Sequence, residues 1–366
     1  MEIRIFLFKF LLYNRDKNSI SININMVLDN SNEIIKSLFA SYSNEKIVDI
    51  QSIAGAGSAR EYFRVFYNGG TAIVAIGNNV AENEAFLYFT KAFSEYGIAV
   101  PKLLAVSGDR LSYMLSDVGT VSLLEYIESA RKEGNTDAKI LDIYKTVLSR
   151  LLEIQIEVGP KLDYSRCLVR STFDKQQLYF DLNYFKYYYL KLTELPFDEQ
   201  KLEKDFQTFI DFIGESTEGY FLYRDFQARN IYIQDGKPYF IDYQGGMSGP
   251  LQYDVASLLY QSRAGLHDEM REQLLDFYIA ELSKHISIST QAFKDTYYAI
   301  VLSRTLQTLG AYGFRGVIQQ KELFLKSIPQ SIEILKNIAQ KVESSIDIPY
   351  FQSILKQLQT KSIINA

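Results

Sequence analysis

Short apolar runs alternate with turns in the first third of the chain, which is the pattern of β-strands joined by hairpins. Residues 61–67 (EYFRVFY) alternate between two faces with period two, and residues 71–76 (TAIVAI) are apolar and rich in β-branched side chains. Residues 68–70 (NGG) separate these runs as a turn. We therefore predict that the two runs form an antiparallel hairpin.

A helix and a second hairpin are predicted next. Apolar residues over 85–96 fall at helical spacing, and Gly97 follows in the position of a C-cap. We expect this helix to pack on the sheet. Residues 103–115 then contain two short apolar runs around a turn at Gly108 and Asp109, which indicates two further strands.

The apolar spacing becomes mostly helical over 120–215 and again after residue 250, with one strand-rich island at 219–246. A β-rich part followed by a larger helical part predicts two lobes that share a cleft, where ligands usually bind. The expected division is 1–26 as an accessory N-terminal extension, 27–116 as the β-rich lobe and 117–366 as the helical lobe.

Composition restricts the class of protein. The 366 residues are 47% hydrophobic and 23% charged, which suits a globular fold. A formal net charge of −5 argues against nucleic acid as the main partner. One cysteine, Cys167, and two histidines exclude the usual zinc sites and most Cys/His or Ser/His/Asp mechanisms, and they suit a reducing cytoplasm. A general base is therefore expected to be a carboxylate.

The N-terminal segment 1–13 (MEIRIFLFKFLLY) is apolar but short, and Glu2, Arg4 and Lys9 interrupt it. It does not approach the uncharged stretch of about 18 residues that a membrane-spanning helix requires. We expect a cytoplasmic protein with no membrane partner.

The strand-rich island brings oxygen-bearing side chains together. Residues 235–236 (DG) are a strong turn signal between IYI (231–233) and PYFI (238–241), which predicts a hairpin. In this hairpin Asn230 and Asp242 become neighbours at the open end, about 7 to 8 Å apart at the backbone. Their side-chain oxygens can converge on one hard cation such as Mg²⁺, which also keeps positions for substrate phosphates.

Asp225 precedes Asn230 by five residues, on the loop that leads into the hairpin. If one aspartate holds a metal with Asn230, the other is free to act as a base. A single Asp beside a turn is more often a backbone cap. The joint spacing D-x4-N, an apolar hairpin and then IDYQGG favours a catalytic site over that alternative.

Residues 223–230 (YRDFQARN) and 240–246 (FIDYQGG) resemble the catalytic and metal-binding motifs of the aminoglycoside phosphotransferase and choline kinase-like family, which shares its fold with protein kinases. The resemblance extends over about residues 27–345, including GPLQYDVASLLY (249–260) and LGAYGFRG (309–316). Within the family, the chain looks most like the bacterial cell-wall amino-sugar kinases, which phosphorylate the anomeric hydroxyl of N-acetylmuramate or N-acetylglucosamine.

This resemblance implies an α+β, protein-kinase-like fold, with a small antiparallel N-lobe that carries one main helix and a mainly helical C-lobe. It implies that Asp225 is the base that accepts the proton of the acceptor hydroxyl. Asn230 and Asp242 would hold Mg²⁺, with ATP as the phosphate donor. Tyr223, where the wider pattern has His, and Asp254, which would brace the catalytic loop, are implied as structural support.

The nucleotide is expected to bind the N-lobe. Residues 54–65 (AGAGSAREYFRV) stand where this fold places its glycine-rich phosphate loop. The third strand lacks the lysine that usually holds the phosphates, so Arg60 or Arg64 is expected to reach them, and Glu82 or Glu84 is left without an evident partner. The other residues predicted to bind nucleotide are Gly55, Gly57 and Ser58 in the loop, and Met114, Leu115 and Ser116 as the hinge facing the purine.

The acceptor is expected to be a hydroxyl of a small molecule, and the residues predicted to contact it are Gln244, Asp181 and Arg315. A carboxylate on the acceptor would suit Arg315. The aromatic segment 179–189 has two interpretations, namely sugar stacking and core packing at helical spacing.

Two alternatives to an amino-sugar kinase remain. An aminoglycoside (antibiotic) kinase would need an acidic acceptor pocket. A non-catalytic, nucleotide-binding pseudokinase is suggested by the missing lysine, but the joint presence of Asp225, Asn230 and Asp242 argues against it. A protein kinase is disfavoured, because GPLQYD follows IDYQGG almost at once and leaves no long activation segment.

Overall fold

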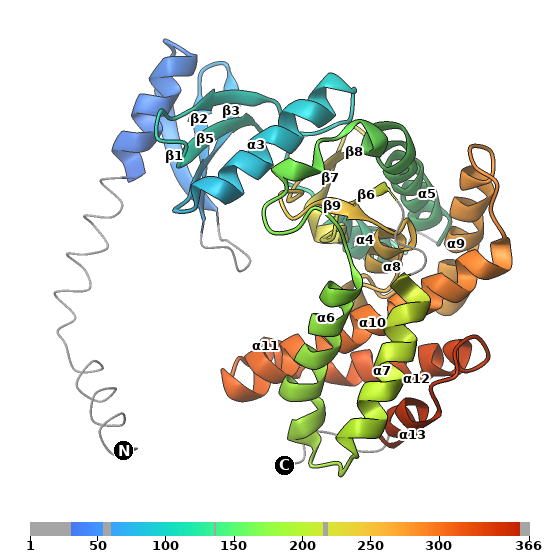
Figure 1. The fold of residues 1–366 in the computed structure, drawn as a ribbon. Coiled ribbons are helices and arrows are strands. Elements are labelled where there is room, and N and C mark those ends of the chain that lie inside the picture. Colours follow the sequence, from blue (N-terminus) through green and yellow to red (C-terminus); the bar gives the residue numbers. More distant parts are fainter. Residues whose placement is uncertain (1–30, 54–59, 135–136, 215–218, 359–366) are drawn as a thin grey trace, which may run out of the picture. The chain divides into compact units, whose positions relative to one another are not determined.

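A computed structural model of the chain describes residues 31–53, 60–134, 137–214 and 219–358. The chain divides into two compact units (Figure 1). The first runs to Glu84 and includes Pro101–Asp117, and the second contains Ala85–Val100 and everything from Val118 onward. Helix α3 (Val80–Glu95) therefore contributes its first turn to one unit and the rest of its length to the other.

In its described residues the first unit contains a five-stranded antiparallel sheet with the strand order β1-β2-β3-β5-β4. Tyr67 faces Gly70 across the turn between β2 and β3, which confirms the first predicted hairpin. The pairing of β4 with β5 confirms the second. The strands are β1 (Ile47–Ile53), β2 (Glu61–Tyr67), β3 (Gly70–Ile76), β4 (Leu103–Val106) and β5 (Ser112–Ser116).

A helix over residues 31–42 packs on one face of this sheet. Its apolar residues recur at helical spacing, and the strands contribute alternate residues, as a half-buried sheet requires. By contrast, the helix that we expected on the sheet, α3, has three aromatic residues, Phe86, Phe89 and Phe93, in contact with rings of the second unit. The buried cluster of the sheet joins Ile35, Leu38 and Phe39 to Phe63, Val65, Ala72, Val74 and Met114.

The second unit is mainly helical over its described residues (Figure 1). Two of its helices continue into π-helical turns, η1 (Ile154–Val158) after α5 and η7 (Gly313–Ile318) after α10. None of the helices in the described ranges combines the length and apolarity of a membrane span. The helices besides α3 are α4 (Leu123–Lys132), α5 (Asp137–Glu153), α6 (Lys175–Tyr188), α7 (Glu199–Gly214), α8 (Gln252–Leu259), α9 (Asp268–Leu282), α10 (Thr290–Tyr312), α11 (Glu322–Leu325), α12 (Ile328–Glu343) and α13 (Pro349–Leu358).

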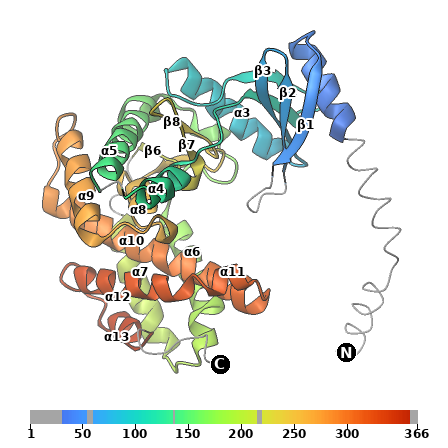
Figure 2. The same cartoon turned by 180° about the vertical axis from the view of Figure 1, so that it is seen from behind.

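Helix α10 packs against α6, α8 and α12 (Figure 2). The backbone of α10 approaches that of α6 closely, because one glycine lies in the last turn of α10 and another directly follows the helix. A Cβ atom at Gly313 would lie 1.7 Å from the backbone oxygen of Tyr188, and one at Gly310 would lie 3.0 Å from the backbone nitrogen of Phe185. Only glycine permits this contact between the two backbones.

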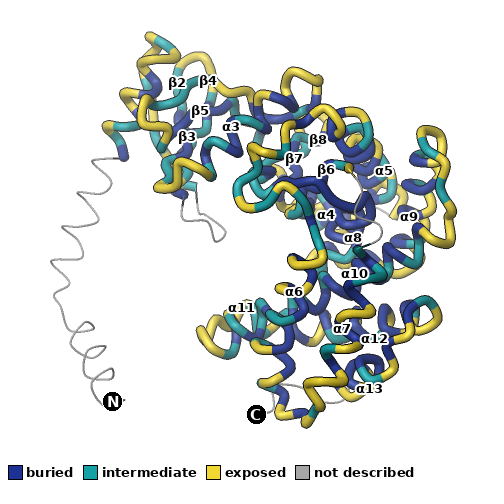
Figure 3. The backbone as a smooth tube through the Cα atoms, in the orientation of Figure 1, coloured by how far each residue is buried: buried dark blue, intermediate teal, exposed yellow. Residues whose placement is uncertain are grey.

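Two short antiparallel pairs form the strand-rich island. Strand β6 (Tyr220–Leu222) pairs with β9 (Met247–Gly249), and β7 (Ile231–Gln234) pairs with β8 (Lys237–Phe240). Gln234 faces Lys237, while Asp235 and Gly236 have φ values of 51° and 72°, as a two-residue hairpin turn requires. The predicted hairpin and its register are confirmed. Helix α8, which is buried along its whole length, follows β9 (Figure 3).

Candidate active site

The three residues predicted for catalysis and metal binding lie at one edge of the strand-rich island, where Asn230 contacts the side chain of Asp242 and the backbone of Asp225. Asp225 follows β6, Asn230 ends the 3₁₀ turn η5 (Ala228–Asn230), and Asp242 follows β8. The amide nitrogen of Asn230 donates to Oδ2 of Asp242 over 3.1 Å and to the backbone oxygen of Asp225 over 2.9 Å. The juxtaposition predicted from the hairpin register is therefore present.

The environments of these side chains differ in a way that suits different tasks. Asn230 is 7% exposed, Asp242 is half-buried and Asp225 is exposed. One carboxylate beside one carboxamide is an oxygen donor set that suits Mg²⁺ and leaves room for substrate phosphates. Over the described ranges, no group of three or more His, Cys, Asp or Glu side chains forms a metal site made by the protein alone.

The backbone of the candidate site is strained at two positions, and side chains hold the first of them. Arg224 and Asp242 have φ values of 76° and 71°, a left-handed conformation that costs a residue with a Cβ roughly 1 to 2 kcal/mol. Asp254 accepts the N–H groups of Tyr223 and Arg224 over 2.6 and 3.0 Å. The guanidinium group of Arg304 donates to the backbone oxygen of Arg224 over 3.4 Å.

Asp254 lies in the first turn of α8 and is fully buried. Burial raises the pKa of its carboxyl to about 7, although the two backbone N–H donors and Arg304 oppose the shift. Both oxygens of Asp254 thus accept from the segment that immediately precedes Asp225, which is the arrangement expected of a loop brace.

Tyr223, at the position where the wider pattern has His, supplies a hydrogen bond as well as a buried ring. Its side chain is buried, and its hydroxyl donates to the backbone oxygen of Ile241, directly before Asp242. Burial raises the pKa of Tyr223 well above its usual value, so the hydroxyl keeps its proton and remains a donor. The phenol therefore ties the Asp225 loop to the Asp242 segment.

Tyr243 is a residue that the sequence analysis missed. It directly follows Asp242 and is completely buried. Its ring stacks on Phe86 of α3, with centroids 5.0 Å apart and planes 3° from parallel, and its hydroxyl lies 2.7 Å from Oγ1 of Thr90. An aromatic residue one position after a proposed metal ligand was the available signal, but its partners lie far away in the sequence.

The candidate acceptor residues occupy different surroundings. Nε2 of Gln244 donates to Oδ1 of Asp242 over 2.9 Å, so Gln244 lies at the predicted metal site. Asp181 is buried on α6 and accepts from Gln177 and Gln307 over 3.1 and 3.2 Å. Burial raises the pKa of Asp181, and the nearby Arg224 and Arg304 oppose that shift.

Arg315 is exposed on η7, with its guanidinium group 5.3 Å from the ring centroid of Phe324. Among the contacts of the described residues, none joins Arg315 to Asp225, Asn230 or Asp242. Both interpretations of the aromatic segment on α6 retain support. Leu178, Leu182 and Phe185 form its buried face, whereas Tyr179, Phe180 and Tyr187 are exposed.

Arg60 begins the segment that leads into β2 and is only 5% exposed. Nη2 lies 2.5 Å from Oε1 of Glu82, and Nη1 donates to the hydroxyl of Tyr113 over 3.2 Å. The other loop residues predicted to bind nucleotide, Gly55, Gly57 and Ser58, lie outside the described residues.

The expectation that the glutamates of α3 lack partners is wrong. Glu82 pairs with Arg60, and Glu84 accepts from Arg110 over 2.5 and 3.1 Å. Arg64 makes a bidentate pair with Asp117 over 2.7 and 3.3 Å. Of the two arginines proposed to replace the missing lysine, Arg60 is the one that pairs with a glutamate of α3.

The residues of the predicted hinge lie in and at the end of strand β5. Met114 and Leu115 lie on the interior strand β5, where Met114 faces Val74 of β3 and Ala105 of β4. Because β5 pairs with a strand on each side at these positions, backbone groups of Met114 and Leu115 take part in the sheet. Their contact with the purine stays a prediction. The N–H of Ser116 at the end of β5 likewise donates to the backbone oxygen of Lys102 over 2.8 Å.

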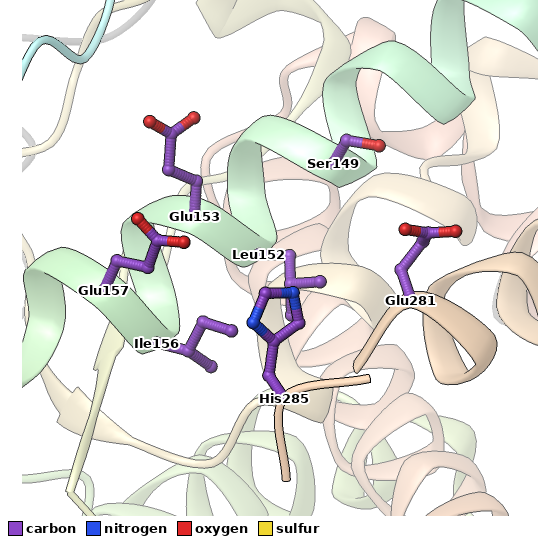
Figure 4. Close-up of a pocket in the computed structure, with 7 residues that line it drawn as sticks. All are labelled: Ser149, Leu152, Glu153, Ile156, Glu157, Glu281 and His285. Atoms are coloured by element: carbon purple, nitrogen blue, oxygen red, sulfur yellow. The ribbon is translucent and has the colours of Figure 1, made fainter. Parts of the chain in front are cut away.

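A small pocket in the second unit lies on α5, η1 and the segment that ends α9 (Figure 4). None of the residues predicted for the active site lines it. Its lining residues are Ser149, Leu152, Glu153, Ile156, Glu157, Glu281 and His285.

An antiparallel five-stranded sheet and a mainly helical unit, with Asn230 and Asp242 in contact beside Asp225, are the features of the protein-kinase-like fold. Residues 49–285 match the model of the phosphotransferase enzyme family, and the chain belongs to that family. The predictions of the family, of the α+β fold and of a small-molecule kinase are confirmed.

The chain is 23% identical over 309 residues to an N-acetylmuramate/N-acetylglucosamine kinase of Neisseria meningitidis serogroup B (strain ATCC BAA-335 / MC58), covering 81% of this chain and 87% of that protein. Its fold is similar to that of amicoumacin kinase hAmiN, solved with AMP-PNP, Ca²⁺ and Ami, with a TM-score of 0.59, 11% identity, and 90% and 97% of the two chains covered. It is also similar to choline kinase from Cryptosporidium parvum Iowa II, with a TM-score of 0.53, 14% identity, and 85% and 94% covered.

Proposed function

We propose that this chain is an ATP- and Mg²⁺-dependent kinase that transfers the γ-phosphate to a hydroxyl of an amino sugar of the N-acetylmuramate or N-acetylglucosamine type. The observation that carries the reaction type is the contact between Asn230 and Asp242 directly beside Asp225. The acceptor class is supported by the relative from Neisseria meningitidis, whose similarity extends over most of both chains.

Asp225 is proposed to accept the proton of the sugar hydroxyl as that oxygen attacks the γ-phosphorus and the bond to the β-phosphate oxygen breaks. It is exposed, so a substrate can reach it, and Nε2 of Gln227 donates to its Oδ1 over 3.2 Å. Asp254 and Arg304 hold the backbone of the preceding residue, Arg224, and thereby fix the position of the base.

Asn230 and Asp242 are proposed to hold Mg²⁺, which, when bound, neutralises charge on the transferring phosphates. Arg60 is proposed to bind the phosphates in place of the missing lysine, oriented by Glu82. The purine hinge is then expected beyond Ser116, where the chain leaves the interior strand.

The proposal is tested by incubating the protein with Mg²⁺·ATP and a panel of N-acetylmuramate, N-acetylglucosamine, choline and aminoglycosides, while ADP release is followed. We expect the two amino sugars to stimulate ADP release. Asp225→Asn should lower kcat by about 10² to 10⁴ while leaving nucleotide binding largely intact. Because charge neutralisation carries much of phosphoryl transfer, Asp242→Asn should cost at least as much.

Stimulation by aminoglycosides alone would replace the amino sugar with an antibiotic as the acceptor. If no acceptor stimulates ADP release and Asp225→Asn behaves like the parent, the kinase proposal fails and a nucleotide-binding role takes its place.

A further inference from the structure

Tyr243 stands one residue after the proposed metal ligand Asp242 and is fixed on three sides. Its ring stacks on Phe86, and Phe93 meets it edge-on with centroids 5.2 Å apart. Its hydroxyl lies 2.7 Å from Oγ1 of Thr90, in a fully buried setting. All of these contacts lie within the second unit.

The direction of the hydrogen bond between the two hydroxyls follows from the number of protons available. The hydroxyl of Thr90 has one proton and donates it to the backbone oxygen of Phe86 over 2.7 Å. Tyr243 must therefore be the donor to Thr90. The result is a buried chain of two hydrogen bonds from Tyr243 through Thr90 to the backbone of α3. Hydrogen bonds in such a chain polarise and strengthen one another.

Asp242 needs this support because its backbone is left-handed, with φ of 71°. Asp visits this narrow region more readily than most residues with a Cβ, but contacts on both sides are needed to keep it there within a folded segment. On the preceding side, Ile241 is tied by the hydroxyl of Tyr223 and donates its N–H to the backbone oxygen of Asn230 over 3.1 Å. On the following side, the tie is Tyr243.

We propose that the hydrogen bond from Tyr243 to Thr90 is a positioning contact that holds the carboxylate of Asp242 in its metal-binding orientation. This inference rests on the proposed function in one respect, because it takes Asp242 as a ligand of the divalent cation. Neither Tyr243 nor Thr90 touches the cation or the substrate in this account.

The two single variants should differ in a characteristic way. Tyr243→Phe removes the donor, yet Thr90 keeps its bond to Phe86. Thr90→Val leaves the Tyr243 hydroxyl buried without an acceptor, which costs more than removing both groups. We expect the dissociation constant for Mn²⁺ in the presence of AMP-PNP, measured by the EPR signal of free Mn²⁺, to rise about three- to tenfold in Tyr243→Phe and further in Thr90→Val.

The double variant, Thr90→Val with Tyr243→Phe, distinguishes the loss of this hydrogen bond from a general loss of packing, which a second substitution would only increase. Adding Tyr243→Phe to Thr90→Val removes the orphaned hydroxyl, so the dissociation constant should return toward that of Tyr243→Phe. In the wild-type background the same substitution weakens binding. The Mg²⁺ concentration for half-maximal ADP release should follow the same order across the variants.

Thr305→Val is the matched control. Thr305 is also buried on a helix and donates to the carbonyl four residues earlier, Val301, over 2.8 Å. It has the same intrahelical hydrogen bond as Thr90 without a tyrosine donor. We expect this variant to bind Mn²⁺ like the wild type.

An unchanged Mn²⁺ dissociation constant in Thr90→Val and Tyr243→Phe, or an equal rise in Thr305→Val, would overturn the inference. Mn²⁺ binding that is the same in Asp242→Asn and wild type would overturn it too, because Asp242 would then not be a ligand. Since the binding measurement requires no acceptor, a panel in which no sugar is phosphorylated defeats only the proposed function.

Discussion

At the scale of single residues, the site uses one chemical group in two environments. Asp225 is exposed and open to a substrate hydroxyl, whereas Asp254 is fully buried and faces two backbone N–H groups. The exposed carboxyl group therefore suits the proposed task of a base, and the buried one suits the task of holding the backbone.

The raised pKa of Asp254 predicts that activity depends on pH. Only the ionised carboxylate keeps both oxygens as full acceptors for Tyr223 and Arg224, so kcat should rise with pH through about 7. Asp254→Asn presents one oxygen and one N–H₂ group to two donors, so it should lower kcat and remove this acidic limb. A pH profile of kcat for both proteins checks the prediction, and an unchanged acidic limb in the variant would contradict it.

The stability of the fold should respond to Asp254 in the opposite sense. Its folded pKa of about 7 lies above the ordinary value of 3.8, so the native state binds the proton more tightly than the unfolded chain. The contribution of protonated Asp254 to the free energy of unfolding is thus fully present below pH 3.8 and is lost as pH rises through about 7. Urea unfolding of wild type and Asp254→Asn on both sides of pH 7 should show the difference between them changing with pH.

From the ion pair between Arg60 and Glu82 we predict a specific effect on nucleotide affinity. Without Glu82, its nearly buried guanidinium group loses its counter-charge and its orientation. Glu82→Gln should therefore raise the KM for ATP by about tenfold, with a smaller effect on kcat. Glu84→Gln is the control, because Glu84 lies on the same helix as Glu82 but pairs with Arg110, which is more exposed than Arg60. Equal effects of the two substitutions would remove the case for Arg60.

At the scale of elements, the backbone contact between α6 and α10 is the least tolerant feature of the helical unit. Gly313→Ala would place a Cβ 1.7 Å from the backbone oxygen of Tyr188, so one helix must shift. We expect the free energy of unfolding to fall by about 3 kcal/mol. Gly108→Ala, where nothing lies within 4 Å of the added atom, should be nearly neutral. Chemical denaturation of both variants measures the difference, and near-equal stabilities would refute the steric argument.

The hairpin of β7 and β8 explains why part of the site could be predicted. An Asp-Gly pair supplies the two left-handed residues of a tight turn, and this local signal fixes the register. The register in turn places Asn230 beside Asp242 without any knowledge of the rest of the fold.

The surroundings of the predicted hinge could not be read from the sequence, for the opposite reason. The sequence of β5 shows a strand, but it does not show that the strand lies between β3 and β4. That position depends on pairings with distant segments, and it decides whether the backbone of Met114 is available. Tyr243 was missed on the same ground, because its partner Thr90 is 153 residues away in sequence.

At the scale of the whole molecule, ligand binding should raise the stability of the native state. A ligand present at about a hundred times its Kd adds about 2.7 kcal/mol to the free energy of unfolding. We therefore expect Mg²⁺·AMP-PNP to raise the Tm of the wild type, and addition of EDTA to remove most of that rise. In Asp242→Asn the shift should be small at all Mg²⁺ concentrations, and a wild-type shift in that variant would argue against Asp242 as a ligand.

The left-handed backbone of Arg224 and Asp242 has an evolutionary consequence. Glycine would relieve the backbone strain at both positions, yet this protein has an arginine at position 224 and an aspartate at position 242. A population selected for heat resistance alone would be expected to drift toward glycine at these two sites. Glycine in place of Asp242 would also remove the carboxylate that we propose as a ligand of the cation, so the gain in stability would be accompanied by a loss of the proposed activity.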